Sequence, residues 1–143
     1  MLQVMESMDI DELVERFQFF DEWEDRYRYL IDLGRTVPDL PAADRTEETK
    51  VRGCMSQVWF VGGLDSSVEP AVMRFRADSD SHIVKGLIAV LLVLYDGHPP
   101  SRAQQVDVKA TFSSIGLDEH LSPNRRNGFF AMVDRIRSLS QAA

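Results

Sequence analysis

The only cysteine of this chain, Cys54, lies in the segment RGCMSQVW, residues 52 to 59. A cysteine acts as a nucleophile through its thiolate, so it needs access and surroundings that favour negative charge. Gly53 allows backbone conformations that other residues avoid and can place Cys54 at the tip of a loop. Ser56 and Gln57 add hydrogen-bonding groups. The alternative is a buried thiol that packs as a small hydrophobic residue, and the local pattern leaves both readings open.

A base beside the thiol would suggest hydrolytic chemistry, but none is adjacent in the sequence. The histidines are His82, His98 and His120. A cysteine–histidine pair could therefore arise only through the fold. His82 falls at the start of an expected helix, where it could approach the loop or simply be exposed. We interpret the other two as turn and loop residues.

Metal and nucleotide sites lack the spacing they require. One cysteine and three scattered histidines do not form a zinc pattern, so we expect no metal and no cofactor. The absence of a CxxC motif excludes two-thiol exchange within one chain. Gly62 and Gly63 are not part of a phosphate-binding loop motif.

Length and charge indicate one acidic globular domain, residues 1–143. The chain is long enough to bury a core without disulfides. Its formal net charge of −7 argues against nucleic-acid binding. The longest apolar run, residues 87–95, is too short to cross a membrane. The acidic N-terminus resembles neither a signal nor a transit peptide, so we expect a cytoplasmic protein.

Two helices are predicted at the N-terminus. Ser7 or Asp9 can cap the first, whose apolar residues recur at helical spacing over residues 10–17. The second should begin at Asp21 and end at Gly34, which suits the position after a helix end. The short connection predicts a helical hairpin.

Three short strands should follow and form an antiparallel sheet. The first is expected near Val51, the second over residues 57–61 and the third over residues 72–77. Gly62 and Gly63 should limit the second strand. Cys54 would then lie in the loop between the first two strands.

Further helices complete an α+β fold. Asp80 or Ser81 should begin a helix over residues 82–95 that is apolar nearly all round and therefore buried. Short helical segments follow. A final helix should begin at Ser122, with Pro123 in its first turn. Arg125 and Arg126 in that turn oppose the helix dipole, and they form either an ordinary solvated surface or an anion-contacting patch.

Read together, these segments resemble the SufE and CsdE cysteine desulfuration proteins. Residues 52–59 are similar to that family's G-C-x-S-Q-V-W signature. Three more segments match it in order, so the resemblance covers nearly the whole chain: WEDRYRYLIDLGRTVPDLP (residues 23 to 41), DSDSHIVKGLIAVLLVLYDG (78 to 97) and LSPNRRNGFFAMVDRIR (121 to 137).

The resemblance implies a fold like that of the IscU scaffold and a role as sulfur acceptor and activator of a cysteine desulfurase, whose release of sulfide it would stimulate. Such proteins take sulfur from a pyridoxal-phosphate cysteine desulfurase, of the SufS or CsdA kind, and pass it to a scaffold complex like SufBCD. Cys54 matches the acceptor position. The same resemblance implies that the resting cysteine packs against an apolar cavity and that its loop moves to reach the desulfurase. It leaves monomer and homodimer open.

The resemblance also suggests residues around the acceptor. Asp80 matches an acidic position near the cysteine loop, and Arg125 matches an arginine on the desulfurase-facing side of the last helix. Both are candidates for a partner interface, whereas Gly86 could serve close packing. Met55 departs from the glutamine that is common after the family's cysteine. Two alternatives stay open, a docking module that carries no sulfur and a cysteine-dependent hydrolase or peroxidase.

Overall fold

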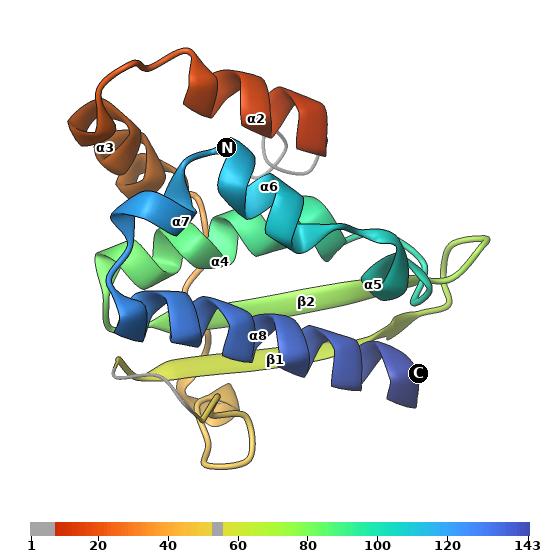
Figure 1. The fold of residues 1–143 in the computed structure, drawn as a ribbon. Helices are drawn as coiled ribbons and strands as arrows, with labels where there is room; N and C mark the ends of the chain where they lie inside the picture. Colours follow the sequence, from red (N-terminus) through yellow and green to blue (C-terminus); the bar gives the residue numbers. More distant parts are fainter. Residues whose placement is uncertain (1–7, 53–55) are drawn as a thin grey trace.

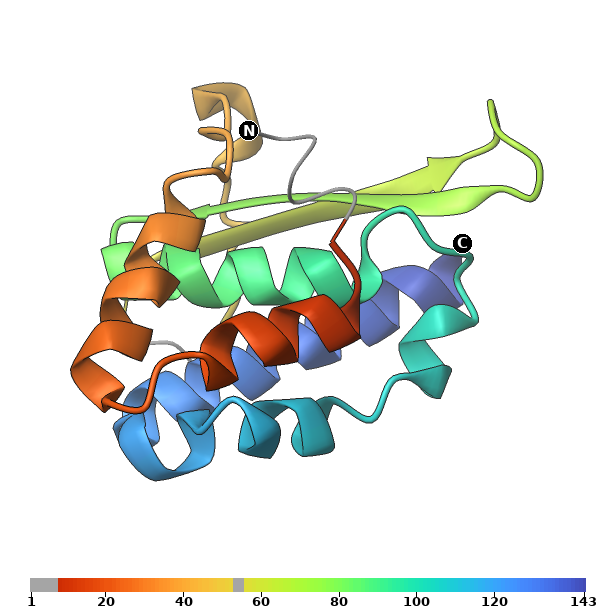
Figure 2. The same ribbon diagram turned by 90° about the horizontal axis from the view of Figure 1, so that it is seen from above.

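The computed structural model describes residues 8–52 and 56–143, and its helices lie mainly on one side of a two-stranded sheet (Figures 1 and 2). This arrangement confirms the predicted α+β class. In chain order the elements are α2 (Ile10–Gln18), α3 (Trp23–Gly34), the 3-10 helix η1 (Ala42–Asp44), β1 (Val58–Asp65), β2 (Val72–Ser79), α4 (His82–Tyr95), α5 (Arg102–Gln105), α6 (Val108–Ser114), α7 (Leu117–His120) and α8 (Pro123–Ala142).

The two N-terminal helices occur where they were predicted. Asp9 caps α2, and its side chain accepts the backbone N–H of Glu12 at 2.9 Å. The second helix begins at Trp23, two residues later than predicted, without a side-chain cap. Near the connection Phe17 meets Tyr29 edge to face, with ring centroids 5.0 Å apart. Both helices then pack against α4.

The sheet is an antiparallel hairpin whose register pairs Val58 with Ser79 and Asp65 with Val72. Its tip projects beyond the helices in both ribbon views (Figures 1 and 2). Gly62 and Gly63 do not end the strand as predicted, since β1 continues through them to Asp65. An added Cβ at Gly62 would meet the Phe75 ring at 2.5 Å, so this glycine lets the ring pack onto the strand.

The predicted first strand is reduced, among the described residues, to an isolated bridge between Lys50 and Trp59. Two backbone hydrogen bonds flank this bridge. Val51 N–H donates to Val58 O at 2.8 Å, and Phe60 N–H donates to Thr49 O at 2.9 Å. The pairing stops there because Thr49 N–H donates to the Thr46 hydroxyl at 3.2 Å and so turns away from β1.

Helix α4 is the centre of the core, as its apolar sequence predicted, and Ser81 caps it. It crosses α3 at two glycines. A Cβ on Gly86 would lie 2.4 Å from the Leu30 carbonyl oxygen, and one on Gly34 would lie 2.7 Å from the Gly86 nitrogen. Gly34 is therefore the last residue of α3, needed for helix–helix contact, and not the expected residue beyond its end.

Helix α8 begins as predicted, with Ser122 as N-cap and Pro123 in the first turn. Its buried face includes Phe129, Met132 and Ile136. It packs against β1 and α4, so it connects the sheet to the central helix. Within residues 8–52 and 56–143, no helix combines the length and hydrophobicity needed to cross a bilayer.

The α3–α4 crossing gives a stability prediction. Gly86→Ala should lower the free energy of unfolding by about 1 to 3 kcal/mol, because the added methyl group meets backbone atoms that cannot rotate away. Gly63→Ala is the control, since a Cβ there has no neighbour within 4 Å. Urea unfolding at neutral pH measures both. Equal effects of the two substitutions would show that the crossing tolerates a side chain.

Candidate functional site

The cysteine-bearing segment, residues 52–57, is fastened at its base. The bond from Val51 N–H to Val58 O joins its two ends. On the C-terminal side, Gln57 N–H donates to Asp80 Oδ1 at 3.1 Å, and Asp80 N–H donates to Gln57 O at 3.3 Å. This reciprocal pair fixes the end of the segment to the turn between β2 and α4.

The other side of the segment is held by Arg135 of α8. Its guanidinium donates to the carbonyl oxygens of Thr49, Lys50 and Phe60 at 3.3, 2.8 and 3.4 Å. The two flanks are thus held by different elements, the N-terminal one by α8 and the C-terminal one by Asp80.

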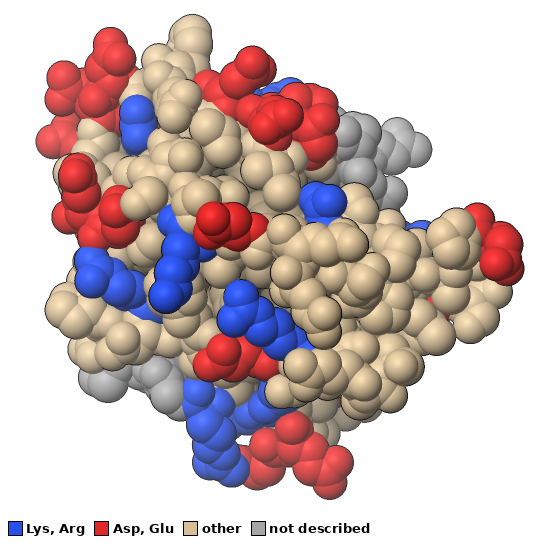
Figure 3. All heavy atoms as spheres, turned by 45° about the vertical axis from the view of Figure 1, so that its right-hand side comes forward, with Lys and Arg blue, Asp and Glu red and all other residues tan. Residues whose placement is uncertain are grey.

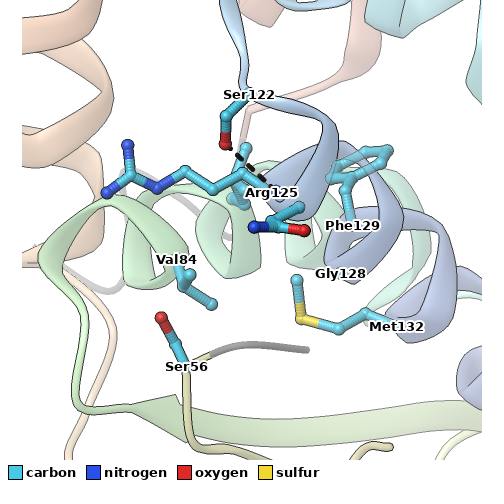
Figure 4. Close-up of a pocket in the computed structure, with 9 residues that line it drawn as sticks. Ser56, Val84, Ser122, Arg125, Gly128, Phe129 and Met132 are labelled. Carbon is cyan, nitrogen blue, oxygen red and sulfur yellow. Dashed lines mark hydrogen bonds between the residues drawn. The ribbon is translucent and has the colours of Figure 1, made fainter. Parts of the chain in front are cut away.

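A cavity of about 350 Å³ lies between the start of β1, α4 and the first half of α8 (Figure 4). One part of its wall is polar, with Ser56, Ser122, Asn124 and Arg125. The remainder is apolar apart from backbone, and comprises Val84, Leu87, Gly128, Phe129 and Met132. A cavity of this composition can hold a small, polarizable group whose charge faces the polar side.

Arg125 is the cation of this wall. It is exposed at the beginning of α8, and its side chain donates to the Tyr27 hydroxyl at 3.3 Å. Its backbone N–H donates to Ser122 Oγ at 3.3 Å (Figure 4). The neighbouring Arg126 donates instead to the Asp118 carbonyl oxygen. Arg125 is thus oriented by α3 and by the helix cap beside the cavity.

A buried carboxylate, Asp78, fixes the same end of the sheet. Its oxygens accept the backbone N–H groups of Leu40 and Ser79 at 2.9 and 2.8 Å. Arg45 reaches it at 2.8 Å and Lys85 at 3.3 Å. Burial alone would raise the pKa of Asp78, but these bonds outweigh burial and the pKa lies below its ordinary value.

Lys85 shows the matching shift. Burial would lower the pKa of its ammonium, but hydrogen bonds to Asp39 and Asp78 raise it above the ordinary value. Arg45 also stacks over the Trp59 ring, with its guanidinium carbon 5.3 Å from the ring centroid. Residues 40–45, which precede the cysteine-bearing segment in the chain, are therefore anchored to the sheet through Asp78 and Trp59.

The predicted site residues are found in different settings. Cys54 and Gly53 lie outside the described residues. Ser56 lines the cavity together with Arg125, whereas Gln57 is exposed and contributes its backbone to the pair with Asp80. Asp80 is exposed and holds the flank of the segment, but it does not line this cavity.

The histidines are distributed over three regions. His82 is exposed at the beginning of α4. His98 lies in the predicted turn, where burial first and the charge of Arg102 second lower its pKa. His120 ends the short helix α7 and stacks on Trp23, with ring centroids 4.4 Å apart. Among the described residues no group of three or more His, Cys, Asp or Glu could hold a metal ion.

Two residues of the site were not predicted from the sequence. Arg135 could only be assigned to the last turns of a helix, because its carbonyl partners are more than 70 residues away. Asp78 begins the stretch DSDS, whose four side chains all accept hydrogen bonds in the structure. In the sequence, the signal that could have identified Asp78 was this run of four polar residues directly after the expected strand over residues 72–77.

Comparisons with known proteins agree with this geometry. The family model described as "SufE: Fe-S metabolism associated domain" matches residues 11–140. An uncharacterized SufE-like protein of Rhizobium meliloti (strain 1021) is 45% identical over 129 residues, which are 90% of this chain and 92% of the relative. Another, of Rhizobium etli, is 48% identical over 128 residues, 90% of this chain and 86% of the relative.

The fold is also similar to that of a solved structure. The solution structure of a hypothetical protein from Thermus thermophilus matches with a TM-score of 0.73 at 22% identity, and the match covers 94% of each chain. At this identity the match supports the fold alone.

The buried carboxylate gives a pH prediction. Asp78→Asn should lower the free energy of unfolding at pH 7 by about 2 kcal/mol or more, since charged hydrogen bonds are lost from a side chain that is 3% exposed. Because folding lowers the pKa of Asp78, its contribution is complete above the unfolded value of about 3.9 and is lost as pH falls through the folded value. The difference in stability between wild type and variant should therefore shrink in urea unfolding as the pH falls below about 3.9. A difference that stays constant with pH would contradict this role.

Proposed function

The chain belongs to the SufE family, and on that premise we propose that Cys54 accepts sulfur from a pyridoxal-phosphate cysteine desulfurase. The family gives a role in iron–sulfur metabolism and sulfur transfer. The observation that supports the finer assignment is local. Ser56, two residues after Cys54 in the chain, lines a cavity with Arg125, and both flanks of the segment are fastened.

The proposed step is thiol exchange on a persulfide. The Cys54 thiolate attacks the outer sulfur of the desulfurase persulfide, the sulfur–sulfur bond breaks, and the desulfurase thiolate leaves. Cys54 then carries one additional sulfur. No external oxidant or reductant is consumed, because one sulfur–sulfur bond replaces another. A scaffold thiolate can take the outer sulfur by the same exchange.

The cavity suits a carrier of this kind. Its apolar wall can limit contact of a reactive sulfur with water, and Arg125 on the polar side can favour a developing negative charge. Asp80 holds Gln57, at the C-terminal end of the segment, against the turn between β2 and α4. The transfer needs no base inside this chain if the thiol is activated within the complex.

The partners of the proposal follow from the family. They are a SufS- or CsdA-like desulfurase as donor and a SufBCD-like scaffold complex as recipient, in the cytoplasm. The exposed position of Arg125 beside the cavity supports its assignment to the donor-facing surface.

Mass spectrometry tests the carrier role directly. After incubation with an active SufS-like desulfurase and free cysteine, the wild-type protein should gain one sulfur atom on Cys54. Cys54→Ser should gain none and should abolish the stimulation of sulfide release. Unmodified wild-type protein beside an active desulfurase would refute the proposal. Stimulation that persists with Cys54→Ser would instead identify a docking module that carries no sulfur.

Arg125 gives a separate prediction about docking. Arg125→Met should raise the KM of the desulfurase reaction for this protein about fivefold, because an exposed cation beside the cavity contributes to association. The wild-type reaction should also lose more affinity at high salt than the variant does. Arg74→Met is the charge-matched control, since Arg74 is exposed toward the far end of the hairpin and pairs with Asp65. Equal KM values for the two variants would show that Arg125 does not contribute to the interface with the desulfurase.

A further inference from the structure

We propose that Arg135 is a positioning residue for sulfur transfer, because its guanidinium completes the pairing of residues 49–51 with β1. It thereby fixes the flank from which the chain enters the cysteine-bearing segment. The inference rests on the proposed function for its biological meaning, but its evidence is independent of any partner.

One ladder hydrogen bond is missing between residue 49 and β1. In an antiparallel ladder, residues that form a hydrogen-bonded pair exchange two N–H···O bonds. Phe60 N–H donates to Thr49 O at 2.9 Å, but the return bond from Thr49 N–H to Phe60 O is not made. Thr49 N–H donates to the Thr46 hydroxyl instead, at 3.2 Å.

Arg135 supplies the missing donor. Its Nη1 lies 3.4 Å from Phe60 O and 3.3 Å from Thr49 O, and its Nη2 lies 2.8 Å from Lys50 O. The guanidinium therefore bridges both sides of the interrupted pairing. A carbonyl left without a donor in a partly buried site costs free energy, so the Arg135 side chain stabilises the pairing of this isolated bridge with β1.

Arg135 lies on the same helix as several residues of the cavity wall. Met132, which lines the cavity, precedes it by three residues and so lies on a neighbouring part of the helix surface. Gly128 and Arg125 line the same cavity one and two turns earlier. One continuous helix thus forms the cavity wall and holds the entering flank, so the distance between them is set by a rigid element.

The choice of arginine agrees with this role. Its planar fork presents several N–H groups in fixed directions and can contact three carbonyl oxygens together. A lysine ammonium is a compact point charge and cannot reproduce that arrangement. Arg135→Lys should therefore retain the charge but only part of the positioning.

The test uses the single thiol of the chain as its own probe. Arg135→Met and Arg135→Lys are compared with wild type, and Arg137→Met is the control because Arg137 is exposed on the same helix. Iodoacetamide alkylation of the isolated proteins measures the reactivity of Cys54 without a partner. Urea unfolding measures stability, and desulfurase kinetics separate kcat from KM.

We expect Arg135→Met to change the Cys54 alkylation rate and to lower the stimulated kcat roughly tenfold with little change in KM, since misplacement of a reacting group has effects of this size. Arg135→Lys should lie between this variant and wild type. Arg137→Met should match wild type. If Arg135→Met does not fold, Arg135→Lys decides the question through the same alkylation rate.

Folded Arg135 variants that are alkylated at the wild-type rate would overturn the inference, whatever their stability. A loss of stability alone would indicate a purely structural contact. If wild-type Cys54 gains no sulfur from the desulfurase, the proposed function fails, yet the alkylation rates still decide whether Arg135 positions the segment.

Discussion

The end of the sheet at which the cysteine-bearing segment joins β1 depends on the buried carboxylate of Asp78. It accepts hydrogen bonds from Leu40 N–H before β1, from the N–H of Ser79 at the end of β2 and from Lys85 of α4. Removing a charge from water is costly, and only several donors at short distance make such a group favourable. Since Asp78 pairs with Trp59 across the ladder, this network fixes the strand that directly follows the cysteine-bearing segment.

Each of the three residues after Asp78 accepts a hydrogen bond that fixes a different part of the backbone. Ser79 accepts the N–H of Ser81, Asp80 holds Gln57, and Ser81 caps α4 through Val84 N–H. A change of direction between strand and helix normally leaves backbone donors unsatisfied. Here the side chains of residues 78–81 satisfy several of these donors and also anchor one flank of the site. The turn is therefore a structural and a functional element together.

Much of the fold followed from sequence, because caps and apolar periodicity act locally. Asp9, Ser81 and Ser122 cap helices as predicted, and α4 is buried as its composition required. The strand expected near Val51 failed as a prediction because Thr46, four residues before Lys50, competes for a ladder donor. The thiol and the arginine at the start of the last helix could be selected by resemblance, but the contact of Arg135 with distant carbonyls could not. Such a contact depends on the packing of α8 against β1, which no local pattern encodes.

The distribution of charge gives the site its electrostatic character. On the face in Figure 3, acidic side chains gather along the upper edge, where Figure 1 places α2 and α3, and most visible basic side chains lie below them. Exposed charges act over about 8 Å at physiological ionic strength. A partner at the cavity therefore interacts more strongly with the local positive charge of Arg125 than with the net charge of −7. On the proposed function, Arg125 can present a local positive charge to an anionic sulfur species although the protein is acidic, and the position of the single thiol then determines its reactivity. That is why residues that hold the flanks, and not a neighbouring base, are expected to control it.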